Sequence, residues 1–271
     1  VKGPVDTRLS KVDPTVLTVS QPLVSRVMVQ TGEGDAAPLT SLGISPQGYL
    51  FGLIGKNNIE QLVDFNKLYS LPVDKIPFAF ITMLQQAVTT KENIADTVKI
   101  QRLEKSLRDN KDALKRFNEK LVELMSNRGQ QIINLYLEGD EAEIERRRYY
   151  NSLSSGYDIY PKMFAVALKL VSPQNQLHHI LQVKYHYFSG VTARIKIPLV
   201  ENPARLIDTA LLEQTAALKL EENAAYINNE LGIIYKLKKD YVTAEKYFLR
   251  ATQITPSWAL PWSNLGGLYN H

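Results

Sequence analysis

Small residues recur at regular places in the apolar stretch 225–256, where a helix would be expected to carry larger side chains. Gly232 lies in the first half of this stretch, and Ala244 and Ala251 lie in the second half. Two helices joined by a short turn approach each other closely only where one side of the contact is small. The pattern therefore predicts two antiparallel helices that nest at these residues, with the turn at 238–240.

Larger residues around these positions complete a repeat of about 34 residues. With Ala225 as the first place, the repeat-defining residues are Leu231, Gly232, Tyr235, Ala244, Phe248, Ala251 and Pro256, and a second unit continues with Trp262, Leu265, Gly266 and Tyr269. Residues 204–271 thereby resemble the tetratricopeptide repeat family. An earlier unit is degenerate, because Gln214 occupies the place of the large aromatic residue.

The resemblance implies an α-solenoid whose first helices line a concave groove that binds a peptide or a segment of another protein. The places that would face the groove hold Tyr226, Asn229, Ile233, Lys236 and Leu237. The alternative for each of them is packing against a neighbouring repeat. One subset of the family grips a C-terminal carboxylate with Lys and Asn at two groove places, and Asn229 and Ile233 stand there instead.

A long amphipathic helix is predicted over residues 97–128. Its apolar residues alternate at steps of three and four, with Asn110 at the remaining seam position: Ile100, Leu103, Leu107, Leu114, Phe117, Leu121 and Leu124. One interpretation is a coiled-coil dimer in which Asn110 sets the register. The other, which the short length of the seam favours, is a helix that docks within its own chain.

A second helical arm follows and completes a hairpin over residues 96–155, with Gly139 and Asp140 breaking that arm. Glu143 and Arg147 lie at i,i+4, and Glu145 and Arg148 lie at i,i+3. Such spacing is typical of a solvated helix face. The three consecutive arginines 146–148 also offer contacts to an acidic partner, although solvation is the simpler interpretation.

Residues 156–203 suggest a small antiparallel sheet. The segments 182–188 and 191–197 flank Ser189-Gly190 as a β-hairpin would, with 163–171 as a third strand. Three histidines fall here: His178, His179 and His186. Adjacent strand residues point to opposite faces, so the sequence predicts solvated histidines and no metal site.

Residues 1–95 form an N-terminal mixed α/β region of unknown type, with a strand expected at 24–29. Gly32, Gly34 and Ala37 match a dinucleotide-binding spacing, but Pro38 argues against the helix that this site requires. The surroundings of Ser45 do not match a hydrolase elbow. The sequence thus predicts no cofactor and no catalytic residue.

The composition of the chain excludes several kinds of site and partner. The chain has no cysteine, which excludes disulfides and cysteine-ligated metals. Its net charge of +4 comes from interspersed charges, so no nucleic-acid partner is expected. The apolar runs are too short to span a membrane. Its start, VKGPVDTRL, suggests a piece of a longer protein, and the sequence assigns no compartment.

Together these features predict a mainly α fold with a smaller β component, in four parts: 1–95, 96–155, 156–203 and the repeats 204–271. The predicted function is a non-catalytic scaffold that binds a protein or peptide segment. The alternative is a regulatory or recruiting part of a larger enzyme or ligand-binding protein, with its active site in the N-terminal region or elsewhere. Self-association is expected through the truncated repeat or through helix 97–128.

Overall fold

The structure, a computed structural model, describes residues 43–44, 50–51, 63–89, 94–148 and 157–269. Internal contacts divide this part of the chain into two compact units. The first comprises residues 126–148, 157–164 and 173–269, and the second comprises the other described residues. Helices α6 (Lys111–Glu138) and α8 (Ile159–Leu170) contribute residues to both units. No helix in the described ranges combines the length and apolarity that crossing a membrane requires.

The fold of the described residues is all-α, not mainly α with a smaller β component, and the antiparallel sheet predicted at 156–203 is wrong. Helices α8 and α9 (Gln176–Ile195) run through this region, followed by the short helix η4 (Ile197–Leu199). The strands that the described residues do contain are β1 (Gly43–Ile44) and β2 (Leu50–Phe51), a pair of two residues each. The strand expected at 24–29 and the glycine motif at 32–37 lie outside the described residues.

Burial on every side explains why α9 looks like two strands in the sequence. Val191, Ala193 and Ile195 alternate as on a strand, but the intervening Arg194 is buried as well. A helix surrounded by other helices loses the one-sided 3.6-residue pattern. Gly190 makes no turn; it lies inside α9, where an added Cβ would be 2.6 Å from Nε2 of Gln214.

The long helix predicted at 97–128 is two helices, α5 (Ile94–Asp109) and α6. Oδ1 of Asn110 accepts hydrogen bonds from the backbone N–H groups of Asp112 at 2.9 Å and Ala113 at 3.1 Å. Asn110 therefore caps α6 instead of occupying a coiled-coil seam. The seam residues on either side are buried within the chain: Ile100, Leu103, Leu107, Phe117, Leu121 and Leu124.

Helix α4 (Ile76–Thr89) packs against α5 and supplies much of the apolar core of the second unit. The rings of Phe80 and Phe117 meet edge to face with 6.3 Å between their centroids. The short helices α3 (Phe65–Ser70) and η2 (Val73–Lys75) precede α4, and Asp64 caps α3 with its side chain. This unit is thus an ordinary helical core.

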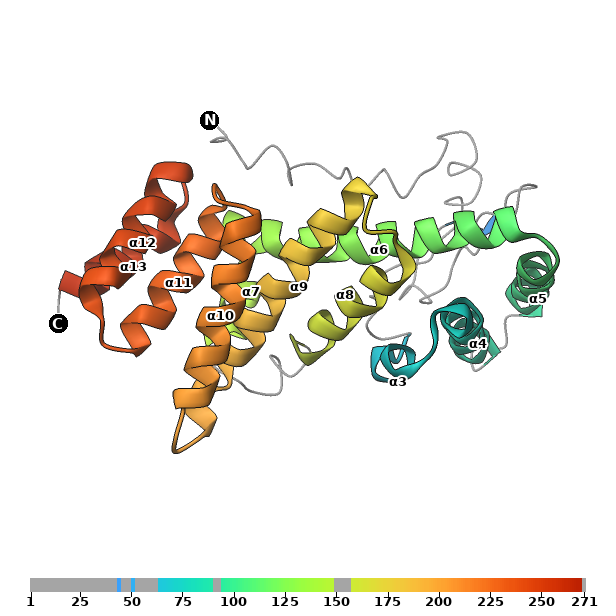
Figure 1. The fold of residues 1–271 in the computed structure, drawn as a ribbon, viewed down its shortest axis with the longest axis horizontal. Helices are drawn as coiled ribbons and strands as arrows, with labels where there is room; N and C mark the ends of the chain where they lie inside the picture. The colour runs from blue at the N-terminus through green and yellow to red at the C-terminus, as the bar shows by residue number, and fades with distance from the viewer. Residues whose placement is uncertain (1–42, 45–49, 52–62, 90–93, 149–156, 270–271) are drawn as a thin grey trace, which may run out of the picture. The chain divides into compact units, whose positions relative to one another are not determined.

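Consecutive helices pack side by side through the C-terminal part of the first unit (Figure 1). After α9 they are α10 (Ala204–Leu220), α11 (Ala225–Leu237), α12 (Tyr241–Ile254) and α13 (Ala259–Tyr269). Each contacts the next one along the chain. This arrangement is compatible with an α-solenoid or another helical repeat.

Two glycines allow these helices to approach closely. An added Cβ on Gly232 of α11 would lie 2.5 Å from the ring of Phe248 in α12. Gly190 of α9 lies in the same way against Gln214 of α10. The turn between α11 and α12 passes through Lys239 at φ 63°, and Oδ1 of Asp240 accepts a hydrogen bond from Thr243 N at 3.1 Å. The side-chain amide of Gln214 thus fills the space between α9 and α10 that the ring of Phe248 fills between α11 and α12.

Candidate functional site

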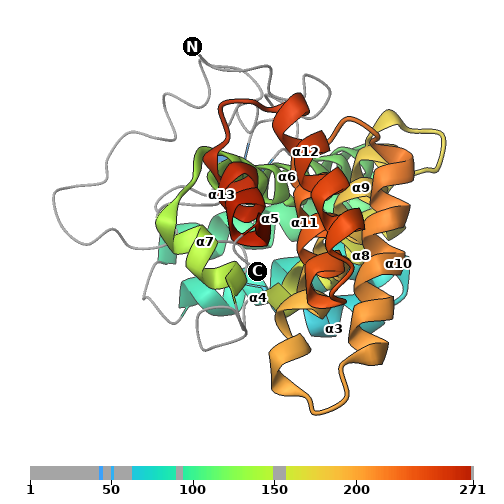
Figure 2. The ribbon, with the colours of Figure 1, turned by 90° about the vertical axis from the view of Figure 1, so that its left-hand side faces the viewer.

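Helix α7 (Glu141–Arg148) is separated from α6 by Gly139 and Asp140. Gly139 has φ 78°, a left-handed conformation that glycine adopts at little cost. Asp140 then begins the new helix, because its Oδ1 accepts a hydrogen bond from the backbone N–H of Glu143 at 2.8 Å. In the view of Figure 2, α7 and α10 lie on opposite sides of α11.

The buried residues of α7 are two charged ones. Glu143 and Arg147 are each 2% exposed, and Nε of Arg147 lies 2.6 Å from Oε1 of Glu143. This i,i+4 pair was expected on a solvated face, and that expectation is wrong. The neighbouring pair, Arg148 with Glu145 at 3.5 Å, does lie in solvent.

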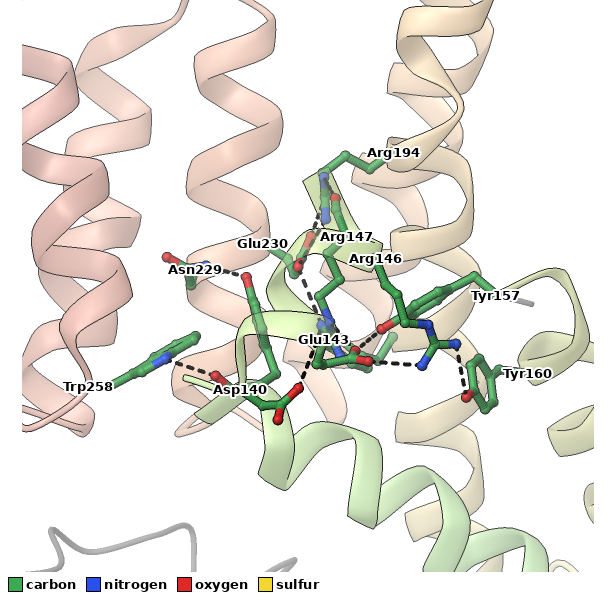
Figure 3. Close-up of polar contacts among 12 residues, drawn as sticks. Asp140, Glu143, Arg146, Arg147, Tyr157, Tyr160, Arg194, Asn229, Glu230 and Trp258 are labelled. Atoms are coloured by element: carbon green, nitrogen blue, oxygen red, sulfur yellow. Dashed lines mark hydrogen bonds and ion pairs between the residues drawn. The ribbon is translucent and has the colours of Figure 1, made fainter. Parts of the chain in front are cut away.

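Two further charged residues meet this pair from the helix stack (Figure 3). Nη1 of Arg147 lies 3.6 Å from Oε1 of Glu230 in α11. Nη2 of Arg194 in α9 donates to the same carboxylate oxygen at 3.3 Å, and its Nη1 donates to the carbonyl oxygen of Arg147 at 2.9 Å. Nη1 of Arg146, a half-buried residue, also lies 3.0 Å from Oε2 of Glu143, so two fully buried guanidinium groups and a third that reaches solvent meet the two buried carboxylates.

Three buried tyrosines surround the charges. The guanidinium of Arg147 lies 3.8 Å from the ring centroid of Tyr136 and donates a hydrogen bond to the hydroxyl of Tyr187. The hydroxyl of Tyr157 donates to Glu143. We call these seven residues the α7 cluster: Tyr136, Glu143, Arg147, Tyr157, Tyr187, Arg194 and Glu230.

Burial and neighbouring charges shift the pKa values of the tyrosines and arginines in the α7 cluster. Burial raises the pKa of Tyr157 well above its usual value, although Arg147 opposes the shift. Burial likewise raises the pKa of Tyr136 and of Tyr187. For Arg147, burial lowers the pKa, but Tyr157, Tyr187 and Glu143 together raise it well above its usual value. The phenols therefore stay neutral while the arginines stay charged.

Amide and indole groups tie the end of α6 to α11 and α13. Nδ2 of Asn229 donates to the hydroxyl of Tyr136 at 2.8 Å, and Nδ2 of Asn264 donates to Oδ1 of Asn229 at 2.9 Å. Nε1 of Trp258 donates to the carbonyl oxygen of Tyr136 at 3.1 Å. The side of α9, α11 and α13 that meets α7 and Tyr136 is here called the first-helix face. Its contact residues are Tyr187, Arg194, Asn229 and Glu230, and Asn264 of α13 supports Asn229 from behind.

The five residues predicted to line an open groove are distributed between interior and surface. Tyr226 and Asn229 are buried, and the ring of Tyr226 lies 4.7 Å from that of Tyr187. Ile233 packs on the cluster around Phe248. Lys236 is half-buried and Leu237 is 43% exposed. The end of α11 that carries these last two residues is therefore the accessible part of the predicted set.

The histidines lie on α9 and not on strands. Nδ1 of His186 lies 2.7 Å from Oε2 of Glu213, and Nε2 of His179 lies 3.1 Å from the carbonyl oxygen of Leu220. Within the described residues no three His, Asp or Glu side chains gather as a metal site would require.

A separate buried lysine joins α6 to α9. Nζ of Lys184 donates to the carbonyl oxygen of Ser126 at 3.0 Å and to its hydroxyl at 3.1 Å. Burial lowers the pKa of Lys184 from 10.5 to about 7, although the charge of Glu221 opposes this shift. The Lys184 side chain is fully buried, and its ammonium group links α9 to the backbone and side chain of Ser126 in α6.

The α7 cluster has its signal in the burial of α11 and not in the sequence alone. Every residue of α11 from Ala225 to Gly232 is buried, including Glu230. A carboxylate in such a run needs a cationic partner from elsewhere in the chain. The partners Arg147 and Arg194 lie far away in the sequence, so the run indicates that a cation is needed without identifying it.

No family model, curated protein or solved structure matches the chain.

Proposed function

We propose that the chain is a non-catalytic protein-binding scaffold of the tetratricopeptide repeat type, in which the first helices α9, α11 and α13 bind a segment of another protein. One observation carries the proposal: the first-helix face already holds a helix, α7, through ion pairs and hydrogen bonds. A surface that recognises a helical segment of its own chain has the chemistry to recognise one from a partner.

The packing of small against large residues also supports a repeat: Gln214 and Phe248 lie 34 residues apart, as do Gly232 and Gly266, whereas Gly190 precedes Gly232 by 42 residues. Gly232 against Phe248 and Gly190 against Gln214 are the same contact made in consecutive helix pairs. Gly266 in α13 occupies the corresponding place of the next unit, and nothing lies within 4 Å of an added Cβ there. The face of α13 around Gly266 is therefore free to pack against a further element.

An accessible area for a partner lies where the C-terminal end of α11 meets α13. An added Cβ on Gly267 would lie 3.4 Å from Nζ of Lys236, so the lysine crosses the surface of α13 there. Leu237 beside it is 43% exposed. A cation next to an exposed apolar side chain suits a partner segment that carries an acidic residue and an apolar one.

The test captures proteins on the full chain, identifies those retained, and then measures the Kd of each purified candidate. Lys236→Glu is expected to weaken a genuine partner by about tenfold or more, because it reverses a charge at the surface. Lys246→Glu on the exposed side of α12 is the matched control and should leave the Kd unchanged. If both variants bind as the wild type does, the proposed surface is wrong.

A further inference from the structure

We propose that α7 is a built-in occupant of the first-helix face and that it is displaced by a partner helix with the pattern Glu-x-x-x-Arg. This inference rests on the proposed function and identifies the class of partner. In the structure the pattern is supplied by Glu143 and Arg147, which hold each other and reach Tyr187 and Glu230 on the face.

Helix α7 is held mainly by polar groups. Its buried residues are Glu143 and Arg147, while Ala142 is exposed and Ile144 is half-buried. A helix this short does not persist by itself in water, so its conformation depends on the face beneath it. Buried ion pairs return little net free energy after desolvation. An equivalent partner helix makes the same contacts, so the docked state is favoured by the effective concentration that its tether gives α7.

A partner helix that replaces α7 must keep the buried charges of the face balanced. Without α7 the face retains Glu230 and Arg194, which pair with each other. An arginine alone would add an unbalanced positive charge beside Arg194, which burial makes costly. An arginine already paired with a carboxylate one turn away adds no net charge. The face therefore selects the pair and disfavours a single cation.

The connection to α6 allows α7 to leave without disturbing the helix before it. Gly139 is exposed, and nothing lies within 4 Å of an added Cβ. Tyr136, on the α6 side of this joint, keeps its own bonds to Asn229 and Trp258. A rotation at Gly139 would therefore release Glu143 and Arg147 while the end of α6 stays in place.

The experiment uses the full chain and a fluorescent peptide with the sequence of residues 140–148. The variant with both Glu143→Ala and Arg147→Ala is here called the emptied chain, because its α7 lacks the two side chains that bind the first-helix face. We expect the emptied chain to bind this peptide about tenfold more tightly than the wild type, because an occupied site lowers apparent affinity. A chain with Glu145→Ala and Arg148→Ala, which alters the solvated pair, is the matched control and should bind like the wild type.

A second measurement decides the question if the emptied chain does not fold. The chain contains no cysteine, so Arg148→Cys and Thr215→Cys allow two spin labels to be placed on exposed sites of α7 and α10. An excess of unlabelled peptide should lengthen and broaden the distance between the labels. A peptide in which Met replaces the arginine that corresponds to Arg147 should leave the distance between the labels unchanged.

Unchanged distances with excess peptide would overturn the proposal, as would equal peptide affinity in folded emptied and wild-type chains. These failures differ from failure of the proposed function. A captured partner that binds equally well to emptied and wild-type chains would leave the scaffold proposal standing and remove this one. If the peptide exchanges but no partner is captured, α7 is a displaceable occupant of the face, while the scaffold function and the partner helix lose their support.

Discussion

Glu230 of α11 lies 3.6 Å from the guanidinium of Arg147 in α7, measured from Oε1 to Nη1, and both side chains are buried. Removing the carboxylate leaves Arg147 and Arg194 together with Glu143 as the single buried counter-ion of the cluster. We therefore expect Glu230→Ala to lower the free energy of unfolding by about 3 to 5 kcal/mol. Urea denaturation would measure this loss. Glu145→Ala, in the exposed pair, should change it by less than about 0.5 kcal/mol.

Replacing Arg194 and Glu230 together tests whether their ion pair stabilises the fold. In Arg194→Met with Glu230→Met, the remaining Arg147 and Glu143 still balance, and apolar side chains fill the space. We expect the double variant to recover most of the stability lost in Glu230→Met alone, with a coupling of about 1 to 3 kcal/mol. Additive losses in the double-mutant cycle would mean that the two residues do not act as a pair.

Gly232 and Gly266 form a matched pair for testing the repeat packing. Gly232→Ala places a Cβ 2.5 Å from the ring of Phe248, so the ring must move. We expect a loss of about 1 to 3 kcal/mol, seen as a lower Tm. Gly266→Ala meets nothing within 4 Å and should gain up to about 1 kcal/mol from helix propensity. Stabilisation by both substitutions would contradict the close approach of α11 and α12.

Because Lys184 is buried, we expect the free energy of unfolding to rise with pH. With its pKa at about 7 in the folded state and 10.5 as the ordinary value, both states are protonated below pH 7 and the cost of burying the charge is fully present. Between these two values the folded state binds fewer protons than the unfolded state, so stability rises with pH.

We expect the free energy of unfolding to increase by about 2 kcal/mol more in the wild type than in Lys184→Met between about pH 6 and pH 9. Staying below pH 10 avoids the tyrosines, whose raised pKa values act in the opposite direction. Urea unfolding at several pH values measures both slopes. Parallel curves for the two proteins would show that Lys184 is not buried as described.

Asn110 distinguishes a helix cap from a coiled-coil position. Asn110→Leu removes the side-chain bonds to Asp112 and Ala113 and should cost about 1 kcal/mol of stability. In a coiled-coil dimer the same change would stabilise the helices, because a polar residue in the seam reduces stability. Denaturation combined with sedimentation separates the two cases. A more stable, more associated variant would revive the coiled-coil interpretation.

Much of what the sequence predicts correctly depends on contacts between residues close in the chain. The turn predicted at 238–240 does lie between α11 and α12, where Oδ1 of Asp240 accepts a hydrogen bond from Thr243 N. The contact of Gly232 with Phe248 joins two neighbouring helices through a short turn. Such features arise from local propensity and spacing, which are visible without knowledge of any other part of the chain.

The sequence by itself therefore determined helical pairing at the C-terminal end and an apolar seam around Asn110. Tertiary structure decided that α9 is a helix, that Glu143 and Arg147 are buried, and that Tyr226 and Asn229 are covered. Burial in each case comes from distant segments, as when Asn229 meets Tyr136 or Arg147 meets Glu230. The local sequence pattern indicates which residues can be buried, but only the packing of distant segments determines which residues are buried.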